Sequence, residues 1–192
     1  MDQTRPTDPT DQAGFSALWA EAGPAIHAWA SLRLPPMLRA RFDPDDLVQE
    51  VCCRSFVGIS RFDPTRGPFR AWVFGIANHV LKSALLEVGR SPTVSRPTVL
   101  DESTRFIDKV PDDATAVSRR LARDDSFLAF LTAAEDLEDD ERRLLIHRGL
   151  EGLSHDEVAT QLGVTSQVVR KRWERLRPRL EGFASTADLL AP

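Results

Sequence analysis

The chain has 192 residues, of which 42% are hydrophobic and 28% charged, so it can bury a core in one large domain or two small ones. This composition excludes collagen-like and wholly disordered chains. The longest strongly apolar stretch, residues 127–134, is far shorter than the roughly 20 residues of a membrane helix, so we expect no membrane insertion. Because MDQTRPTDPTDQ lacks the apolar stretch of a signal peptide, we expect a cytoplasmic protein.

Metal and redox chemistry have little support in the sequence. The only two cysteines, Cys52 and Cys53, are neighbours, which excludes an intramolecular disulfide framework and favours structural thiols in a reducing compartment. The four histidines are scattered without ligand spacing. We therefore expect no metal site, no cofactor and no enzymatic activity.

Charge is unevenly distributed along the chain. The net charge is −4, which alone argues weakly against a free-standing nucleic-acid binder. Residues 135–141 contain six acids in seven positions, whereas residues 170–179 contain six bases and one acid. A short cationic helix face is thus expected within an otherwise acidic protein.

Proline and glycine divide the sequence into helical blocks, and no block shows the period-two alternation of strands. We therefore predict an all-α fold of two small helical domains joined by a flexible linker. The predicted order is a disordered tail (1–12), a helical domain (13–90), the linker (91–123) and a second helical domain (124–183). Helices are expected at 13–34, 44–60, 68–89, 124–136, 139–149, 155–162 and 166–181.

The helix at 44–60 begins at Asp43-Pro44-Asp45-Asp46, where Asp43 can cap and Pro44 suits the first helical position. Its predicted inner stripe consists of Leu47, Val48, Val51, Cys52 and Ile59. We place Asp46, Gln49, Glu50 and Arg54 on the outer side. Asp46 and Glu50 are like charges four residues apart, which fits either a basic partner surface or plain solvation.

The connector 61–68 and the helix after it carry arginines and aromatic residues. Phe69, Trp72, Val73, Ile76 and Val80 follow helical spacing and are expected in the core. The candidate nucleic-acid contacts are Arg61, Arg66, Arg70, Asn78, His79 and Lys82. Such a set suits an unstacked single strand, and an amphipathic helix against a bundle core would look similar.

Residues 154–181 predict a helix-turn-helix. Ser154 and Glu157 have the spacing of a capping box, Gly163 can end the first helix in the left-handed conformation, and Thr165 can cap the second. The residues Val169, Trp173, Leu176 and Leu180 form the predicted buried stripe of the second helix.

The opposite side of that second helix has base-reading chemistry, because Arg and Lys suit guanine edges and Gln suits adenine. The candidate DNA-binding residues here are Ser166, Gln167, Arg170, Lys171, Arg172 and Arg175. An exposed arginine-rich helix of an ordinary bundle is the alternative. A metal site built on His155-Asp156 would need a second His/Asp pair, and none is suitably placed.

The motifs DDLVQEV (45–51), FDPTRGPFRAW (62–72) and IANHV (76–80) precede LEDDERRLLIHRGLEGLSHDEVATQLGVTSQVVRKRWERLR (137–177). Together they resemble the bacterial extracytoplasmic-function sigma factors over roughly residues 12–90 and 124–181. Members of that family usually carry an asparagine one position after Asn78, where this chain has His79.

The resemblance implies a promoter-recognition subunit with core RNA polymerase and promoter DNA as partners, and it leaves room for an anti-sigma factor. By similarity, the helix of Asp46, Gln49 and Glu50 would dock on polymerase. Residues 61–68 and the next helix would capture the melted minus-ten element, and the last helix would read the minus-thirty-five element. A stand-alone helix-turn-helix regulator is the alternative function.

Overall fold

The computed structural model describes residues 11–91, 96–101, 104–183 and 189–190. Within these ranges the chain forms helices and turns and no strand, which confirms the predicted all-α fold.

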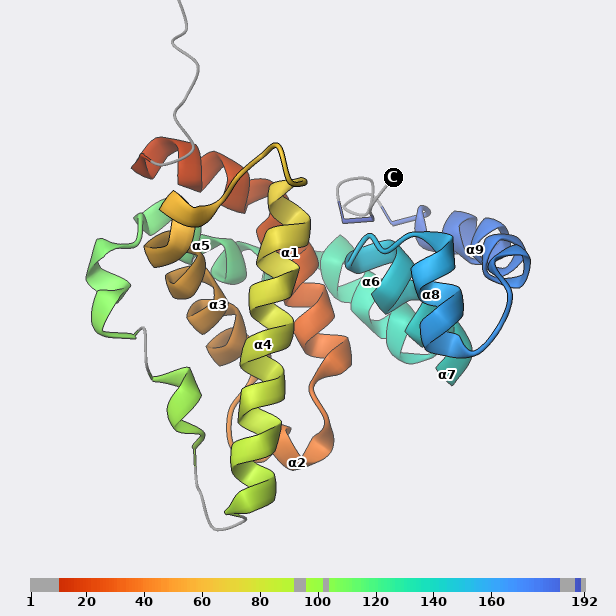
Figure 1. Cartoon of the computed structure of the whole chain (residues 1–192), viewed down its shortest axis with the longest axis horizontal. Coiled ribbons are helices and arrows are strands. Elements are labelled where there is room, and N and C mark those ends of the chain that lie inside the picture. The colour runs from red at the N-terminus through yellow and green to blue at the C-terminus, as the bar shows by residue number, and fades with distance from the viewer. Residues whose placement is uncertain (1–10, 92–95, 102–103, 184–188, 191–192) are drawn as a thin grey trace, which may run out of the picture.

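The N-terminal unit consists of α1 (Gln12–Arg33), α2 (Pro36–Arg39), α3 (Pro44–Gly58), the 3₁₀ turn η1 (Ile59–Arg61) and α4 (Phe69–Arg90). The C-terminal unit consists of α6 (Asp125–Glu135), α7 (Asp139–Leu144), the π-helical turn η4 (Leu145–Leu150), α8 (His155–Leu162) and α9 (Ser166–Leu180). Figure 1 shows the two units side by side, with α1 and α4 lying between α3 and the C-terminal unit.

The N-terminal unit begins at a side-chain cap. The Asp11 carboxylate accepts a hydrogen bond of 2.6 Å from the backbone N–H of Gly14, and residues 1–10 of the predicted tail lie outside the described residues. At α3, Asp43 and Asp46 form a capping box in which each carboxylate accepts from the other residue's N–H at 2.9 Å. These caps satisfy N–H groups that have no partner inside the first helical turn.

The core of the N-terminal unit follows the predicted stripes. All five residues of the predicted inner stripe are buried, four of them in α3 and Ile59 in η1. Phe69, Val73 and Val80 of α4 are also buried, whereas Trp72 and Ile76 are partly buried against the core. The thiols of Cys52 and Cys53 are buried as expected, and burial raises the pKa of Cys53 to about 11.

The C-terminal unit contains the predicted helix-turn-helix. Ser154 and Glu157 form the capping box of α8, and Gly163 ends that helix at a φ of 66°, a conformation that glycine adopts without steric cost. The hydroxyl of Thr165 accepts from the N–H of Val168 and starts α9. The four predicted stripe residues of α9 are all buried. Two helices joined by a tight turn therefore present the opposite face of α9 to solvent.

The described part of the segment 91–123 is more ordered than a flexible linker. It forms the 3₁₀ turns η2 (Thr98–Leu100) and η3 (Thr104–Lys109) and the helix α5 (Asp112–Leu121), which packs against α1 and α3. Figure 1 shows this segment running along the outer side of α3 before it enters α5. Ala114, Val117 and Leu121 are buried, so α5 is anchored by an apolar face of its own, and Val110 just before the helix is buried as well.

None of the described helices is long and apolar enough to cross a membrane.

Gly149 offers a test of packing in the C-terminal unit. A Cβ at this position would lie 2.8 Å from Cη2 of Trp173, 3.0 Å from Cδ1 of Leu145 and 3.1 Å from Cδ2 of Leu190. We expect Gly149→Ala to lower the free energy of unfolding by roughly 1–3 kcal/mol, because overpacking forces neighbours off their rotamers.

The matched control is Gly75→Ala in α4, where nothing lies within 4 Å of the added Cβ. This change should raise stability by roughly 0.5–1 kcal/mol, since alanine loses less conformational freedom than glycine in a helix. Chemical denaturation of both variants measures the difference, and equal effects of the two changes would contradict the packing at Gly149.

Candidate nucleic-acid interface

The outer face of α9 carries exposed polar and basic side chains. Gln167, Arg170, Lys171 and Arg175 are exposed, on the side away from the buried stripe. The Ser166 hydroxyl donates a hydrogen bond to the Asp156 carboxylate, which ties the start of α9 to α8. A helix held in this way can enter a major groove with its N-terminal residues toward the base edges.

Two arginines of α9 are paired with the acidic run at α7. The guanidinium of Arg172 lies 2.9 Å from Oδ2 of Asp140, and that of Arg179 lies 2.6 Å from Oε1 of Glu141. The acidic and basic runs, which are separated in the sequence, therefore meet in the fold, a contact that neither run indicates by itself. Because such exposed pairs contribute only about 0–1 kcal/mol, both arginines remain available to an anionic ligand.

The connector between α3 and α4 forms a shallow hollow of about 270 Å³. Its lining includes Arg61, Arg66 and the aromatic rings of Phe62 and Trp72, whose centroids lie 5.6 Å apart. Arg61 and Arg66 are exposed, and the two rings are partly buried. Aromatic faces beside cations are the features that hold unstacked bases.

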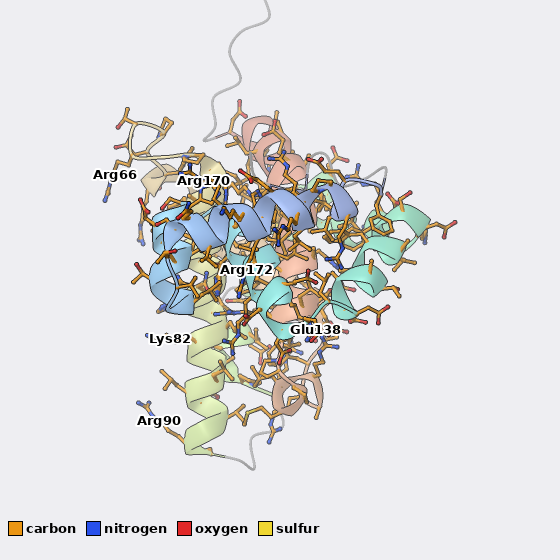
Figure 2. The ribbon with its side chains drawn as sticks, turned by 90° about the vertical axis from the view of Figure 1, so that its right-hand side faces the viewer. Arg66, Lys82, Arg90, Glu138, Arg170 and Arg172 are labelled. Atoms are coloured by element: carbon orange, nitrogen blue, oxygen red, sulfur yellow. The ribbon has the colours of Figure 1, made fainter. Side chains whose placement is uncertain are left out.

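Several basic side chains lie along one edge of the molecule. In Figure 2, Arg66 on the connector and Lys82 and Arg90 on α4 point outward along the same side, and Arg170 lies near the start of α9 toward that side. His79 and Lys82, two of the predicted nucleic-acid contacts, are exposed on α4. This edge therefore joins cations of both units.

Two of the predicted contact residues on α4 are not exposed in this structure. The guanidinium of Arg70 donates to the backbone oxygens of Leu150 at 2.9 Å and Gly149 at 3.3 Å, and also to that of Leu189. The amide of Asn78 donates to the Phe74 oxygen at 3.0 Å and to Oε1 of Glu151 at 3.4 Å. Both side chains are partly buried and bind the C-terminal unit or their own helix, so their contact with nucleic acid stays a prediction.

One residue that was predicted on the outer side of α3 lies inside the fold instead. Glu50 is buried, with 2% of its surface exposed, and its Oε1 accepts from Nε of Arg54 at 2.6 Å. Arg54 in turn donates to the Val99 oxygen at 2.9 Å. The turn η2 thus covers Glu50, which sequence periodicity placed in solvent.

Asp46 is partly exposed and Gln49 is exposed. The Asp46 carboxylate lies 3.0 Å from the guanidinium of Arg96. Partial burial acts to raise the pKa of Asp46, but hydrogen bonds from Arg96 and Asp43 outweigh it and hold the pKa below its usual value. Of the three predicted docking residues, Gln49 therefore carries the most accessible side chain.

Comparison with known families gives the same division of the chain. Residues 18–90 match the family Sigma-70 region 2, and residues 127–180 match the family Sigma-70, region 4. These ranges coincide with the N-terminal and C-terminal units.

Several curated proteins are similar over most of the chain. The ECF RNA polymerase sigma factor ShbA of Streptomyces griseus is 32% identical over 147 residues, which cover 76% of this chain and 73% of ShbA. The ECF RNA polymerase sigma factor SigD of Mycobacterium tuberculosis is 27% identical over 158 residues, covering 82% and 71%. RNA polymerase sigma-H factor of Pseudomonas aeruginosa is 28% identical over 141 residues, covering 72% of each chain. No solved structure gives a significant match.

The match in the N-terminal unit decides between the two functions that the sequence left open, since a stand-alone regulator requires no region 2. A helical unit that matches region 2 precedes a helix-turn-helix that matches region 4, and the ECF sigma factor ShbA is similar over most of both. The chain therefore belongs to the extracytoplasmic-function sigma factors of RNA polymerase.

Proposed function

We propose that this chain directs core RNA polymerase to promoters by reading the minus-thirty-five element with α9 and the melted minus-ten element with the connector 61–68 and α4. The observation that carries the first part is the exposed set Gln167, Arg170 and Lys171 opposite a fully buried stripe. The second part is supported by the hollow that Arg61 and Arg66 form with two aromatic rings. His79 and Lys82 would extend this strand-binding surface along α4.

Docking on polymerase is proposed for the exposed part of α3. Gln49 and the partly exposed Asp46 are the side chains of the predicted docking set that a partner can reach in this structure. Glu50 is buried and would not contact polymerase directly. We propose that it supports the docking surface through its ion pair with Arg54, which stabilises α3. An anti-sigma factor remains a prediction, and we expect the chain to act in the cytoplasm together with polymerase.

Run-off transcription tests this function directly. Purified core polymerase with this chain should produce a discrete transcript from a matching promoter, whereas core polymerase alone should not. Because the chain is net acidic, with one short basic face, the free protein should select promoters poorly at physiological salt. Tight, specific binding by the free protein that core polymerase does not change would contradict the proposal.

Substitutions of Arg170 and Arg175 test base reading and phosphate contact separately. Arg170→Ala should weaken promoter binding by roughly 1–3 kcal/mol and relax the preference for the upstream element, because a base-reading arginine discriminates between sequences. Arg175→Ala should weaken binding to all promoters alike. Competition assays with substituted upstream elements measure both effects, and an Arg170 variant with unchanged affinity and preference would show that α9 presents another face.

Substitutions of Gln49 and Glu50 test docking on polymerase and stability of the fold separately. Gln49→Ala should keep the Tm of the wild type and bind core polymerase more weakly, since its side chain is exposed. Glu50→Ala should lower stability by about 3 kcal/mol, because it removes the partner of a largely buried arginine. Thermal melts and pull-down with core polymerase give the two readouts. A Gln49 variant that binds polymerase as the wild type does would exclude this residue from the docking surface.

A further inference from the structure

One large apolar side chain lies on the exposed surface of α9, that of Val168, with 37% of its surface exposed. The other large apolar side chains that are exposed among the described residues lie outside the helix-turn-helix, at Met37, Val57, Leu86 and Leu128. A single exposed valine is ordinary on a protein surface. The position of Val168 within α9, and not its exposure alone, therefore indicates a role.

Val168 belongs to the first turn of α9, where the backbone is well fixed. Its N–H donates to the Thr165 hydroxyl at 3.4 Å. The next residue, Val169, is fully buried, and Ser166 is tied to α8 through its hydrogen bond to Asp156. A valine in a helix takes mainly one rotamer. The two γ-methyl groups of Val168 are thus held in nearly one position, and ordering them against a ligand costs little side-chain entropy.

The neighbours of Val168 on the helix surface are candidate DNA contacts. Lys171 and Arg172, three and four residues later, share its side of α9, and both are exposed. Arg175 follows one turn further along the same side and is exposed as well. The N-terminal residues of a recognition helix are the ones that meet base edges in the major groove. When α9 occupies a groove, Val168 therefore faces the bases between a base-reading lysine and two arginines that can reach phosphates.

The major groove offers an apolar side chain one favourable partner. Every base pair presents hydrogen-bond donors or acceptors in this groove, and thymine adds a C5-methyl group. A valine placed against a donor or an acceptor removes water from that group without replacing the hydrogen bond, which costs free energy. Contact with the methyl group instead buries apolar surface of both partners. Thymine is therefore the base that Val168 can favour.

We propose that Val168 is a specificity-determining residue that packs against the C5-methyl group of a thymine in the upstream promoter element. The inference rests on the function proposed above, because it requires α9 to read that element. Gln167, Arg170 and Lys171 select their bases by hydrogen bonds, whereas Val168 selects one by apolar contact. The preferred upstream element consequently contains at least one thymine whose methyl group contributes to binding.

Replacing thymine by uracil tests this contact, because uracil keeps the hydrogen-bonding groups of thymine and lacks the methyl group. A promoter that the holoenzyme transcribes is prepared with each thymine of its upstream element changed in turn to deoxyuridine. Competition assays then measure the binding of the holoenzyme, formed from core polymerase and the full chain. At one position the change should weaken binding of the wild type about fourfold, the loss expected when one methyl group is no longer buried.

The test variant is Val168→Ala, which removes both γ-methyl groups and places a strong helix former in α9. Its holoenzyme should bind the thymine promoter and the sensitive uracil promoter nearly equally. The ratio of the two affinities is taken within one variant, so a general change in stability or in polymerase binding cancels. The matched control is Leu128→Ala, which shortens an exposed apolar side chain on α6, outside the helix-turn-helix. This control should keep the ratio of the wild type.

Three results would overturn the role of Val168: an upstream element without thymine, a wild type that binds every uracil promoter as well as the original, or a Val168→Ala variant that keeps the ratio of the wild type. The Arg170→Ala variant distinguishes this failure from failure of the proposed function. If that variant has a relaxed sequence preference while no uracil promoter binds more weakly, α9 reads the element and only the methyl contact is wrong. A holoenzyme that gives no transcript in the run-off assay contradicts both.

Discussion

A carboxylate removed from water must recover its hydrogen bonds within the protein, and Glu151 does so only when the two halves of the chain meet. A buried charge without partners costs several kcal/mol, whereas one with well-placed donors is tolerated. Trp29 and Asn78 supply donors from different helices of the N-terminal unit. An apolar contact alone would allow the units to slide, since hydrophobic burial is non-directional. The directed bonds at Glu151 select one relative placement, and the environments of Arg70 and η4 depend on it.

The C-terminal unit balances its charges in a different way. The acidic run that makes the whole protein net negative contributes Asp140 and Glu141, which lie against arginines of α9. These pairs are exposed, so solvent and salt screen them and their contribution to stability is small. A phosphate can therefore replace a carboxylate at little cost. The acidic composition of the chain is thus compatible with a basic reading helix, because the acids occupy the arginines only weakly.

Most of the fold could be predicted from local signals. Capping residues, the proline pair at 35–36 and helical spacing of apolar residues placed the long helices within a few residues of their observed ends. The left-handed Gly163 and the buried stripe of α9 were predicted because each depends only on neighbours in the sequence. The faces of α9 followed directly, since burial of one side of a helix leaves the other side exposed.

The errors arose where distant segments supply the partner. Glu50 was placed in solvent, although Arg54 four residues later was available to pair with it; the covering turn at Val99 has no local signal. The partners of Arg70 and Asn78 in the C-terminal unit could not be predicted either, because nothing near these residues in the sequence indicates acceptors some 70–120 residues away. α5 could have been recognised, since its buried apolar residues follow the spacing of an amphipathic helix. Proline content and scattered acids obscured that periodicity.

The docked position of α5 limits how far the two units can move apart. While α5 packs on α1, only residues 122–124 connect it to α6, and this short tether reaches at most about 14 Å. Residues 91–124 would reach about 110 Å if fully extended. While α5 stays docked, the two units can therefore rotate near one another but cannot move far apart. A larger separation requires α5 to leave α1 and α3, and release of the segment before α5 would also break the ion pair between Arg96 and Asp46.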